Sequence, residues 1–359
     1  MSGRLDELVA LSRGFGSRPG FALAGGGNTS LKTADRLWVK ASGHRLAAID
    51  ASGFVELDRG KLEAMLDAAD WPEEPAAREA LFVERVMAAR VDPAAGRPSV
   101  EALLHHLLPE RFVVHTHPTA VNALACCVRG GALAEEHLGP SALWQPYADP
   151  GLTLALDLRA RLGGGRGGVV LMENHGLIVS GADAEAIEDA TSSLLRDLPA
   201  ADAAGFGGDP LPADRRTLAE IAATVRGLAA DRAVVPFETL AVRGLVATTG
   251  GRAAALAGPL TPDQIVYCGG FPAFVEAGGS LGAAVAAGPR IVLIAGRGGL
   301  AIHATKKQAA TAAAVYDDAA QVMLAAHALG GVKTMTPAHR VFIEQWEAES
   351  HRQQVAADA

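Results

Sequence analysis

Two histidines separated by one residue are the part of the sequence that points most directly to chemistry. They occur in RFVVHTHPTAVN, residues 111–122, where an apolar run ends at His115 and His117. Side chains alternate between the two faces of a β-strand, so we expect both imidazoles on one face. Pro118 cannot continue a central ladder, and the strand is therefore expected to stop here, at a sheet edge or mouth. Two imidazoles converging at a strand end suit a metal better than a core.

A third histidine is predicted at a similar place. In RGGVVLMENHGLIVSG, residues 166–181, two β-branched runs flank the turn sequence ENHG, which is the pattern of a strand, a tight turn and a second strand. His175 would then lie at a strand end. A single histidine in such a turn is more often structural, but three histidines at strand ends favour a metal. A catalytic zinc usually takes three protein ligands and keeps a fourth position open.

Glu101 is the candidate acid/base. It lies in RPSVEALLH, residues 97–105, where Ser99 is predicted to be the N-cap of a helix that carries Glu101 in its first turn. This helix leads directly into the strand of His115, and an antiparallel return would bring the carboxylate close to the histidines. Helix energetics also prefers a glutamate in the first turn, so the position alone is a weak catalytic signal.

A glycine-rich loop is a candidate for binding an anion. FALAGGGNTSLK, residues 21–32, is followed by the strand-like LWVKASG, which ends at Ser42 and Gly43. Glycines permit close approach of the backbone, and exposed N–H groups together with hydroxyls can hold an anion. The alternative is a pair of hairpin turns without a ligand, which the glycines taken alone favour.

Composition and charge limit the class of protein. The chain has 359 residues, of which 49% are hydrophobic and 20% charged, as in a globular protein of one large or two ordinary domains. The formal net charge of −8, with scattered basic residues, argues against nucleic-acid binding as the main activity. No uncharged apolar run has the length of a membrane span. The three cysteines, Cys126, Cys127 and Cys268, form no disulfide framework, so we expect a cytoplasmic protein.

We predict an α/β fold with two parts. Residues 1–205 are the predicted metal-binding catalytic domain, 206–235 a linker rich in Gly, Pro and Asp, and 236–359 a smaller C-terminal α/β region that ends in helices. Two segments of the last region resemble segments of the first domain. QIVYCGGFPAFV near residue 264 resembles the His115 segment, and PRIVLIAGRGGLAIHATKKQA near residue 289 resembles the His175 segment.

This internal similarity has two interpretations. In a degenerate repeat, Cys268, Gly269 and Gly270 would replace the histidine pair, and Arg297 or a neighbouring glycine would replace His175, so the second copy would lack the metal ligands. Alternatively, strand, glycine turn, strand and helix simply recur, as they do in many α/β domains.

Taken together, these motifs resemble those of the class II aldolase/adducin family, which includes L-fuculose-1-phosphate and L-rhamnulose-1-phosphate aldolases. The resemblance covers roughly residues 4–200 and depends on the order of the GGGNTS loop, the HTH strand and the ENHG turn. The C-terminal GGVKTMTPAHRVFIEQWEAESHR resembles the aldolase half of bifunctional rhamnulose-phosphate aldolase/dehydrogenase proteins, and we expect no dehydrogenase half in this chain. The resemblance implies a layered α/β/α fold with a central, mainly antiparallel or mixed sheet.

The resemblance also implies roles for single residues. Zn²⁺, or another divalent metal, is expected on His115, His117 and His175, with Glu101 as the catalytic acid/base. The family's phosphate-binding groups match Gly27, Asn28, Ser42, Gly43 and Ser99. One position departs from the pattern: Val100 stands where the fuculose enzyme has a second serine, which weakens the case for a phosphorylated substrate. Tyr147 is a candidate for the family's protonating tyrosine.

The implied activity is reversible aldol cleavage of a ketose 1-phosphate or a related sugar acid, through a metal-stabilised enediolate. The alternatives on the same metal site are a sugar-phosphate epimerase, a dehydratase and a decarboxylase. An adducin-like interaction module without catalysis is an alternative of another class, and the intact histidines and Glu101 argue against it for the first domain. The expected partner is a small sugar substrate, with no nucleic acid or membrane, and the family implies a homo-oligomer, often a tetramer.

Overall fold

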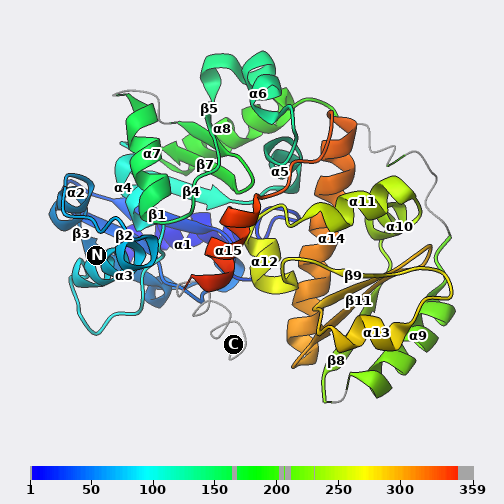
Figure 1. The fold of residues 1–359 in the computed structure, drawn as a ribbon. Coiled ribbons are helices and arrows are strands. Elements are labelled where there is room, and N and C mark those ends of the chain that lie inside the picture. Colours follow the sequence, from blue (N-terminus) through cyan, green and yellow to red (C-terminus); the bar gives the residue numbers. More distant parts are fainter. Residues whose placement is uncertain (1, 164–167, 202–205, 207–211, 230, 347–359) are drawn as a thin grey trace. The chain divides into compact units, whose positions relative to one another are not determined.

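The computed structural model describes residues 2–163, 168–201, 206, 212–229 and 231–346. The chain forms two compact units: Met1–Val121 with Ala134–Leu198, and Asn122–Leu133 with Pro199–Ala359. Each unit contains its own sheet (Figure 1). The domain limits expected from the sequence, 1–205, 206–235 and 236–359, stay a prediction.

The first unit is built on a seven-stranded sheet. Its strands lie in the order β3-β2-β1-β4-β7-β6-β5, and all neighbours are antiparallel except β5 and β6, which are parallel. This is the mixed, mainly antiparallel sheet that the resemblance implied. The strands are β1 Asn28–Lys32, β2 Arg36–Lys40, β3 Phe54–Asp58, β4 Phe112–Thr116, β5 Leu143–Gln145, β6 Val169–Met172 and β7 Gly176–Gly181.

The remaining elements up to residue 198 are helical. They are α1 Ser2–Gly16, α2 Arg59–Leu66, α3 Pro75–Ala88, α4 Ala102–Leu107, α5 Thr119–Ala125, α6 Gly130–Leu138, α7 Leu152–Leu162 and α8 Ala184–Asp197, with short 3-10 turns at Leu46–Ala48, Ala51–Gly53 and Gly139–Ser141.

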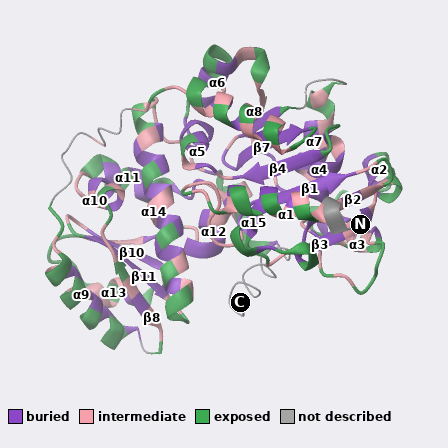
Figure 2. Cartoon of the chain, turned by 180° about the vertical axis from the view of Figure 1, so that it is seen from behind, coloured by how far each residue is buried: buried purple, intermediate pink, exposed green. Residues whose placement is uncertain are grey.

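Helices cover both faces of this sheet. Ser12 of α1 hydrogen-bonds to Thr29, whereas His105 of α4 hydrogen-bonds to Ser30, the next residue of β1. Because adjacent residues of a strand point to opposite faces, α1 and α4 lie on opposite sides of the sheet, as the α/β/α prediction required. Every residue of β4 is therefore buried, which explains why its sequence is a continuous apolar run rather than an alternation (Figure 2).

The second unit contains a four-stranded sheet of order β8-β11-β10-β9. β8 and β11 are antiparallel, β11 and β10 are antiparallel, and β10 and β9 are parallel. The strands are β8 Ala233–Phe237, β9 Ala273–Val275, β10 Ile291–Ile294 and β11 Gly298–His303. The helices are α9 Arg215–Leu228, α10 Leu240–Val246, α11 Thr249–Ala257, α12 Pro262–Cys268, α13 Leu281–Ala286, α14 Lys306–Ala328 and α15 Pro337–Gln345.

Two expectations for this region are changed by the structure. The segment 206–235 contains α9 and the start of β8, because Leu218, Ala222 and Val225 form an apolar stripe that is buried in the core of the second unit. The part of this segment at 207–211 lies outside the described residues. The correspondence of QIVYCGG with the His115 strand, on which the degenerate-repeat interpretation relied, was wrong: Thr261 and Pro262 are the N-cap and first residue of the helix α12, which contains Cys268. Cys268 to Gly270 therefore do not occupy the place of the histidine pair.

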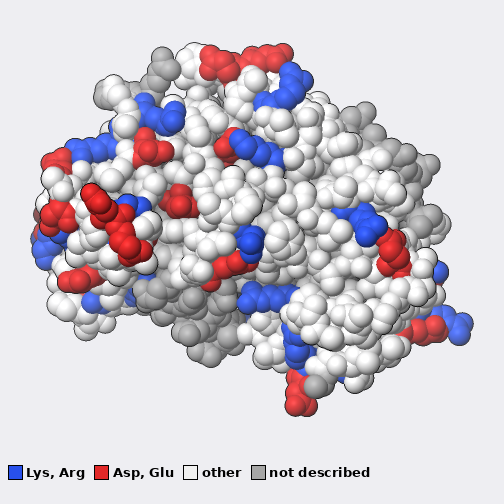
Figure 3. Space-filling view, in the orientation of Figure 1, with Lys and Arg blue, Asp and Glu red and all other residues white. Residues whose placement is uncertain are grey.

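Within the described residues, no helix combines the length and the apolar character that crossing a membrane requires. On the face drawn in Figure 3, basic and acidic side chains of these residues are interspersed rather than gathered by sign.

Candidate metal centre

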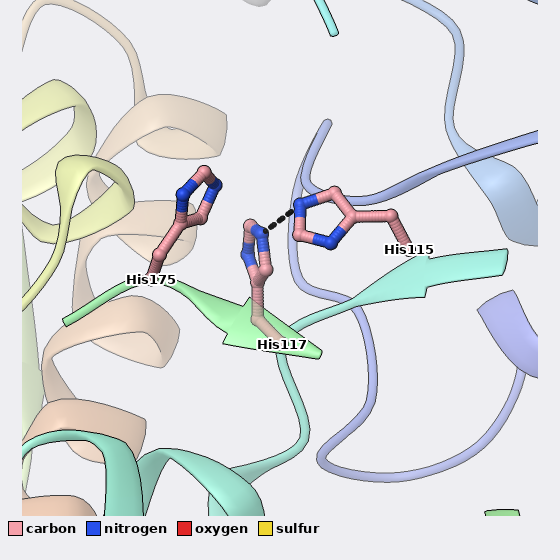
Figure 4. Close-up of side chains that lie close together, drawn as sticks. All are labelled: His115, His117 and His175. Carbon is pink, nitrogen blue, oxygen red and sulfur yellow. Dashed lines mark hydrogen bonds between the residues drawn. The ribbon is translucent and has the colours of Figure 1, made fainter. Parts of the chain in front are cut away.

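Three histidines converge in the middle of the seven-stranded sheet, where β4 ends beside the β6–β7 turn. His115 belongs to β4, His117 follows the end of that strand, and His175 lies in the turn between β6 and β7 (Figure 4). One nitrogen from each ring lies within 4.8 Å of the other two, and the Nε2 atoms of His115 and His117 are 3.0 Å apart. Two ligands on a tetrahedral zinc are separated by about 3.3 Å for bonds of about 2.0 Å, so the spacing is close to that of a metal site.

The hydrogen bonding of His115 fits a metal ligand. Its Nδ1 lies 2.9 Å from the carbonyl oxygen of Leu177. A carbonyl only accepts hydrogen bonds, so Nδ1 carries the proton and the lone pair is on Nε2, which faces the other rings. Burial lowers the pKa of His115 to about 3, and the ring is therefore neutral at physiological pH. A neutral imidazole, oriented by a carbonyl through its other nitrogen, is the form in which histidine binds zinc.

The turn that carries His175 is shaped by the residues on either side of it. Asn174 has a φ of 51°, in the left-handed region that asparagine tolerates better than most residues. A Cβ on Gly176 would lie 2.6 Å from Cδ2 of His117 and 2.7 Å from the carbonyl oxygen of Thr116. Only glycine lets the hairpin approach the end of β4 so closely, and this approach brings His175 to the histidine pair.

Glu101 lies against the same three rings. Its Oε1 is 3.1 Å from Nε2 of His175, and its Oε2 is 3.5 Å from Nε2 of His115. Burial would raise the pKa of this carboxyl, but the hydrogen bonds that it accepts from His175 and from Asn28 favour the charged form, and the pKa is held well below its usual value. The site therefore offers an ionised carboxylate next to a metal-binding triad.

The helix boundary at Glu101 differs from the expected one. Glu101 is itself the N-cap residue of α4, and Ser99 lies two residues earlier, where its hydroxyl accepts a hydrogen bond from the Glu101 N–H at 3.2 Å. Short polar side chains favour such local bonds to the backbone, which makes caps and preceding turns hard to distinguish in a sequence.

A chain of hydrogen bonds fixes the carboxylate from behind. The amide Nδ2 of Asn28 donates to Oε2 of Glu101 at 2.6 Å, and the amide oxygen of Asn28 is bonded to Nε2 of His105. Nδ1 of His105 is 2.7 Å from the hydroxyl of Ser30. An amide oxygen can only accept, so the His105 proton is on Nε2 and Ser30 donates to Nδ1. Burial lowers the pKa of His105 to about 3, consistent with this neutral tautomer.

His105 was not recognised as a site residue in the sequence. Its signal was its spacing, since it lies four residues after Glu101 and so one helical turn further along the same face. The partner of that face, β1, could not be paired with α4 from sequence alone.

The residues expected to bind an anion lie on three segments of the first unit: Gly27–Asn28, Ser42–Gly43 and the stretch that carries Ser99. Gly27 has a φ of 71°, and a Cβ there would lie 2.8 Å from the carbonyl oxygen of His115. The next residue, Asn28, is paired with His115 in the β1–β4 ladder. Ser42 donates its N–H to the carbonyl of Arg97 at 2.8 Å, which joins the Ser42–Gly43 turn to the segment that carries Ser99. Their role toward an anion stays a prediction.

Tyr147, the candidate for a protonating tyrosine, follows β5. Its backbone N–H donates to Oε2 of Glu173 at 3.2 Å, and its side chain is half-buried. Its role as a protonating tyrosine stays a prediction.

Comparisons with known proteins identify the family of the chain. Residues 6–195 match the family model described as Class II Aldolase and Adducin N-terminal domain, and residues 276–352 match Aldolase class II, second domain. The Bacillus subtilis protein named uncharacterized oxidoreductase YuxG is 29% identical over 296 residues, which cover 76% of this chain but 42% of that protein. The chain thus spans less than half the length of this relative.

Two solved structures are similar to part of the chain. The N-terminal class II aldolase domain of a Thermoplasma acidophilum protein is 29% identical with a TM-score of 0.48, over 54% of this chain and 91% of that one. An L-fuculose-1-phosphate aldolase from Thermus thermophilus is 19% identical with a TM-score of 0.35, over 55% and 91% of the two chains.

Proposed function

Because this chain belongs to the class II aldolase and adducin family, we propose that it is a zinc-dependent lyase that reversibly cleaves a ketose 1-phosphate or a related sugar acid. The observation that carries the proposal is the position of Glu101, an ionised carboxylate 3.1 Å and 3.5 Å from two of the three candidate ligand nitrogens. An epimerase, a dehydratase or a decarboxylase would use the same histidines, and the assay below separates them by product.

Each residue has a chemical task in this proposal. His115, His117 and His175 hold the metal, which supplies Lewis-acid stabilisation for charge that develops on the substrate oxygens. Glu101 removes a proton from the carbon that becomes nucleophilic, and returns it in the opposite direction. Asn28 donates to Oε2 of Glu101 and leaves Oε1, the oxygen on the His175 side, to exchange the proton.

The anionic end of the substrate is assigned to the turns that precede Glu101. Ser42, Gly43 and Ser99 offer hydroxyl and backbone groups on two adjoining segments, and Gly27 permits close approach of the backbone to the carbonyl of His115. Val100 adds no hydroxyl, so a carboxylate fits this end as well as a phosphate does. The cytoplasmic location and the homo-oligomer belong to the same proposal.

Metal analysis combined with a product assay tests the proposal. The purified protein should contain one divalent metal per chain, and mixing it with ketose 1-phosphates and sugar acids should release an aldehyde and a three-carbon ketone from one of them. An epimerase would leave the substrate mass unchanged, and a decarboxylase would release CO₂.

Glu101→Gln separates the carboxylate's role from metal binding. The variant should keep its metal and lose cleavage by about 10²- to 10⁴-fold, the usual contribution of general acid/base catalysis. Glu63→Gln is the matched control, since Glu63 bonds to His106 and takes no part in the proposed chemistry. A metal-free wild type, or a Glu101→Gln enzyme with the parental rate, would show the proposal to be wrong.

A further inference from the structure

The sheet of the second unit repeats half of the sheet of the first. The order β8-β11-β10-β9 corresponds to β4-β7-β6-β5, and in both sets the successive pairs are antiparallel, antiparallel and parallel. The registers agree as well: Met172 pairs with Gly176 across one hairpin, and Ile294 with Gly298 across the other. β8 therefore stands in the place of β4, and RAVVPFE corresponds to RFVVHTH.

This correspondence identifies what replaces the metal ligands. Pro236 stands for His115, Glu238 for His117, and Arg297 for His175. The hairpin approaches the strand end equally closely, since a Cβ on Gly298 would lie 2.7 Å from the carbonyl oxygen of Phe237. The turn that presents an imidazole in the first unit therefore presents a guanidinium in the second.

The two charged residues at the positions of the histidines, Glu238 and Arg297, form ion pairs with neighbouring side chains. Oε1 of Glu238 is 3.1 Å from Nε of Arg215, and its Oε2 accepts the N–H of Asp214. Arg297 is paired with the carboxylate of Asp214 through one of its nitrogens, Nη1. The other oxygen of Asp214 caps α9 by accepting the N–H of Thr217 at 3.1 Å. Both oxygens of Asp214 are thus in use, whereas Arg297 has further N–H donors and a side chain that is 42% exposed.

A cavity of about 670 Å³ lies beside this turn, within the second unit. That volume is in the range of small-molecule sites. Arg297, Asp214 and Glu276 all line it, and Glu276 is in an ion pair with Arg252. Its apolar lining comes from α9, β9, α13 and β10 through Ile221, Val275, Leu281 and Ile294. The cavity thus combines a guanidinium with an apolar floor.

We propose that this cavity binds a small monocarboxylate with an aliphatic chain, with the carboxylate on Arg297 and the chain over the four apolar residues. A planar guanidinium matches a carboxylate through paired hydrogen bonds. A phosphate monoester carries nearly two negative charges, and the neighbouring carboxylates Asp214 and Glu276 disfavour it more strongly than a single charge. The proposal is independent of the reaction assigned to the metal centre.

Calorimetric titration of the full-length protein tests it. Propionate, butyrate, valerate and hexanoate should bind with an affinity that increases with chain length, because each added methylene buries apolar surface. The corresponding amides and butyl phosphate should bind at least about tenfold more weakly. The amides lack the negative charge, and butyl phosphate carries nearly two negative charges beside Asp214 and Glu276. Absence of saturable binding by any of the acids at millimolar concentrations would overturn the proposal.

Variants locate the binding. Arg297→Gln should weaken binding of hexanoate by about tenfold or more, and Leu281→Trp should weaken it by filling the cavity while Arg297 stays in place. Arg215→Gln, at a 90% exposed arginine whose partner is Glu238, is the matched control and should bind as the wild type does. Melting temperatures establish that each variant is folded.

A carboxylate could also bind the metal, so His117→Ala is measured in parallel. The proposal expects unchanged hexanoate binding in this variant. Loss of binding in His117→Ala, or its persistence in both Arg297→Gln and Leu281→Trp, would place the ligand elsewhere and overturn the proposal. Neither result depends on whether the enzyme cleaves a sugar.

Discussion

The carboxylate of Glu101 lies within hydrogen-bonding reach of His175 and is held from the other side by Asn28. The amide oxygen of Asn28 accepts from Nε2 of His105 and so fixes the tautomer of that ring, and Ser30 donates to its Nδ1. Such a series has one consistent direction of donation, from Ser30 to Glu101. It positions the carboxylate of Glu101, the proposed acid/base, by side chains that do not themselves need to contact a substrate.

Removing the Asn28 amide should therefore lower turnover without releasing the metal. We expect Asn28→Ala to reduce kcat by about 10- to 100-fold at nearly unchanged metal content, the usual cost of losing a group that orients an active residue. Thr29→Val is the control, because Thr29 points to the opposite face of β1 and bonds to Ser12. An equal loss of kcat in both variants would mean that general distortion of β1, and not the amide, is responsible.

Glu79 is a buried acid outside the site. It is 4% exposed, and within the described residues its carboxylate oxygens have no hydrogen-bond partner. Burial raises its pKa from 4.5 to about 7, with Arg78 opposing this shift and Asp149 adding to it. Since the folded-state pKa lies above the unfolded value, its contribution to stability is complete below about pH 4.5 and is lost as the pH rises through about 7.

Glu79→Gln should remove this pH dependence. At pH 8 the variant should be more stable than the wild type by about 3 kcal/mol, whereas near pH 4 the two should be similar, because the buried group is then neutral in both. Urea unfolding at pH 4, 6 and 8 measures the difference. Glu84→Gln on the exposed side of the same helix is the control, and a Glu79→Gln curve parallel to that of the wild type would contradict the prediction.

At the level of elements, the site depends on a hairpin that is pressed against a strand end. The sequence predicted both strands of this hairpin and its turn, since two β-branched runs flanking ENHG leave few other structures. It did not predict which strand the hairpin would pair with. The β4–β7 ladder, in which Thr116 pairs with Leu177, joins segments about sixty residues apart and is determined by packing on both faces of the sheet.

Gly176→Ala should damage the metal centre through this contact. The added methyl would meet His117 and the carbonyl of Thr116 at under 3 Å, so the turn must move and carry His175 away. We expect metal affinity to fall by at least about tenfold, measured by competition with a chelating dye. Gly168→Ala, whose Cβ would have no neighbour within 4 Å, should bind metal normally. Full metal affinity in Gly176→Ala would show that the hairpin can retreat without moving its histidine.

Local sequence patterns were least reliable where apolar residues form a short buried helix. QIVYC is rich in β-branched and aromatic residues, and it reads as a strand until Thr261 and Pro262 are recognised as a helix start. The strand that corresponds to RFVVHTH is instead RAVVPFE, and the sequences look different because Pro236 and Glu238 stand at the positions of His115 and His117. The repeat became evident only through strand order and register, which depend on long-range pairing.

For the whole molecule, the division of the chain is not a single cut. Asn122–Leu133 belongs to the second compact unit. Its backbone pairs with residues 331–333: Cys127 and Val332 form an isolated antiparallel β-bridge, the N–H of Lys333 donates to the carbonyl of Cys126, and the N–H of Val128 donates to the carbonyl of Gly331. The sequence of this stretch did not predict that it belongs to the second unit, because the residues that it pairs with lie some two hundred residues later in the chain. A catalytic domain ending near residue 205 would therefore lack the residues that cover this segment.

A fragment of residues 1–198 should consequently be less stable than the complete chain. Its 122–133 segment would keep unpaired backbone groups and uncovered apolar side chains, so we expect aggregation, or a melting temperature lower by about 5 °C or more. Co-expression with residues 199–359 should restore a soluble complex, because the second piece supplies the partners of Cys126 and Val128. Differential scanning calorimetry and size-exclusion chromatography of both preparations measure this. If the fragment alone were monodisperse, bound metal and had the melting temperature of the full-length chain, residues 122–133 would not need their partners in residues 199–359, and the limit near residue 205 would describe an independent domain.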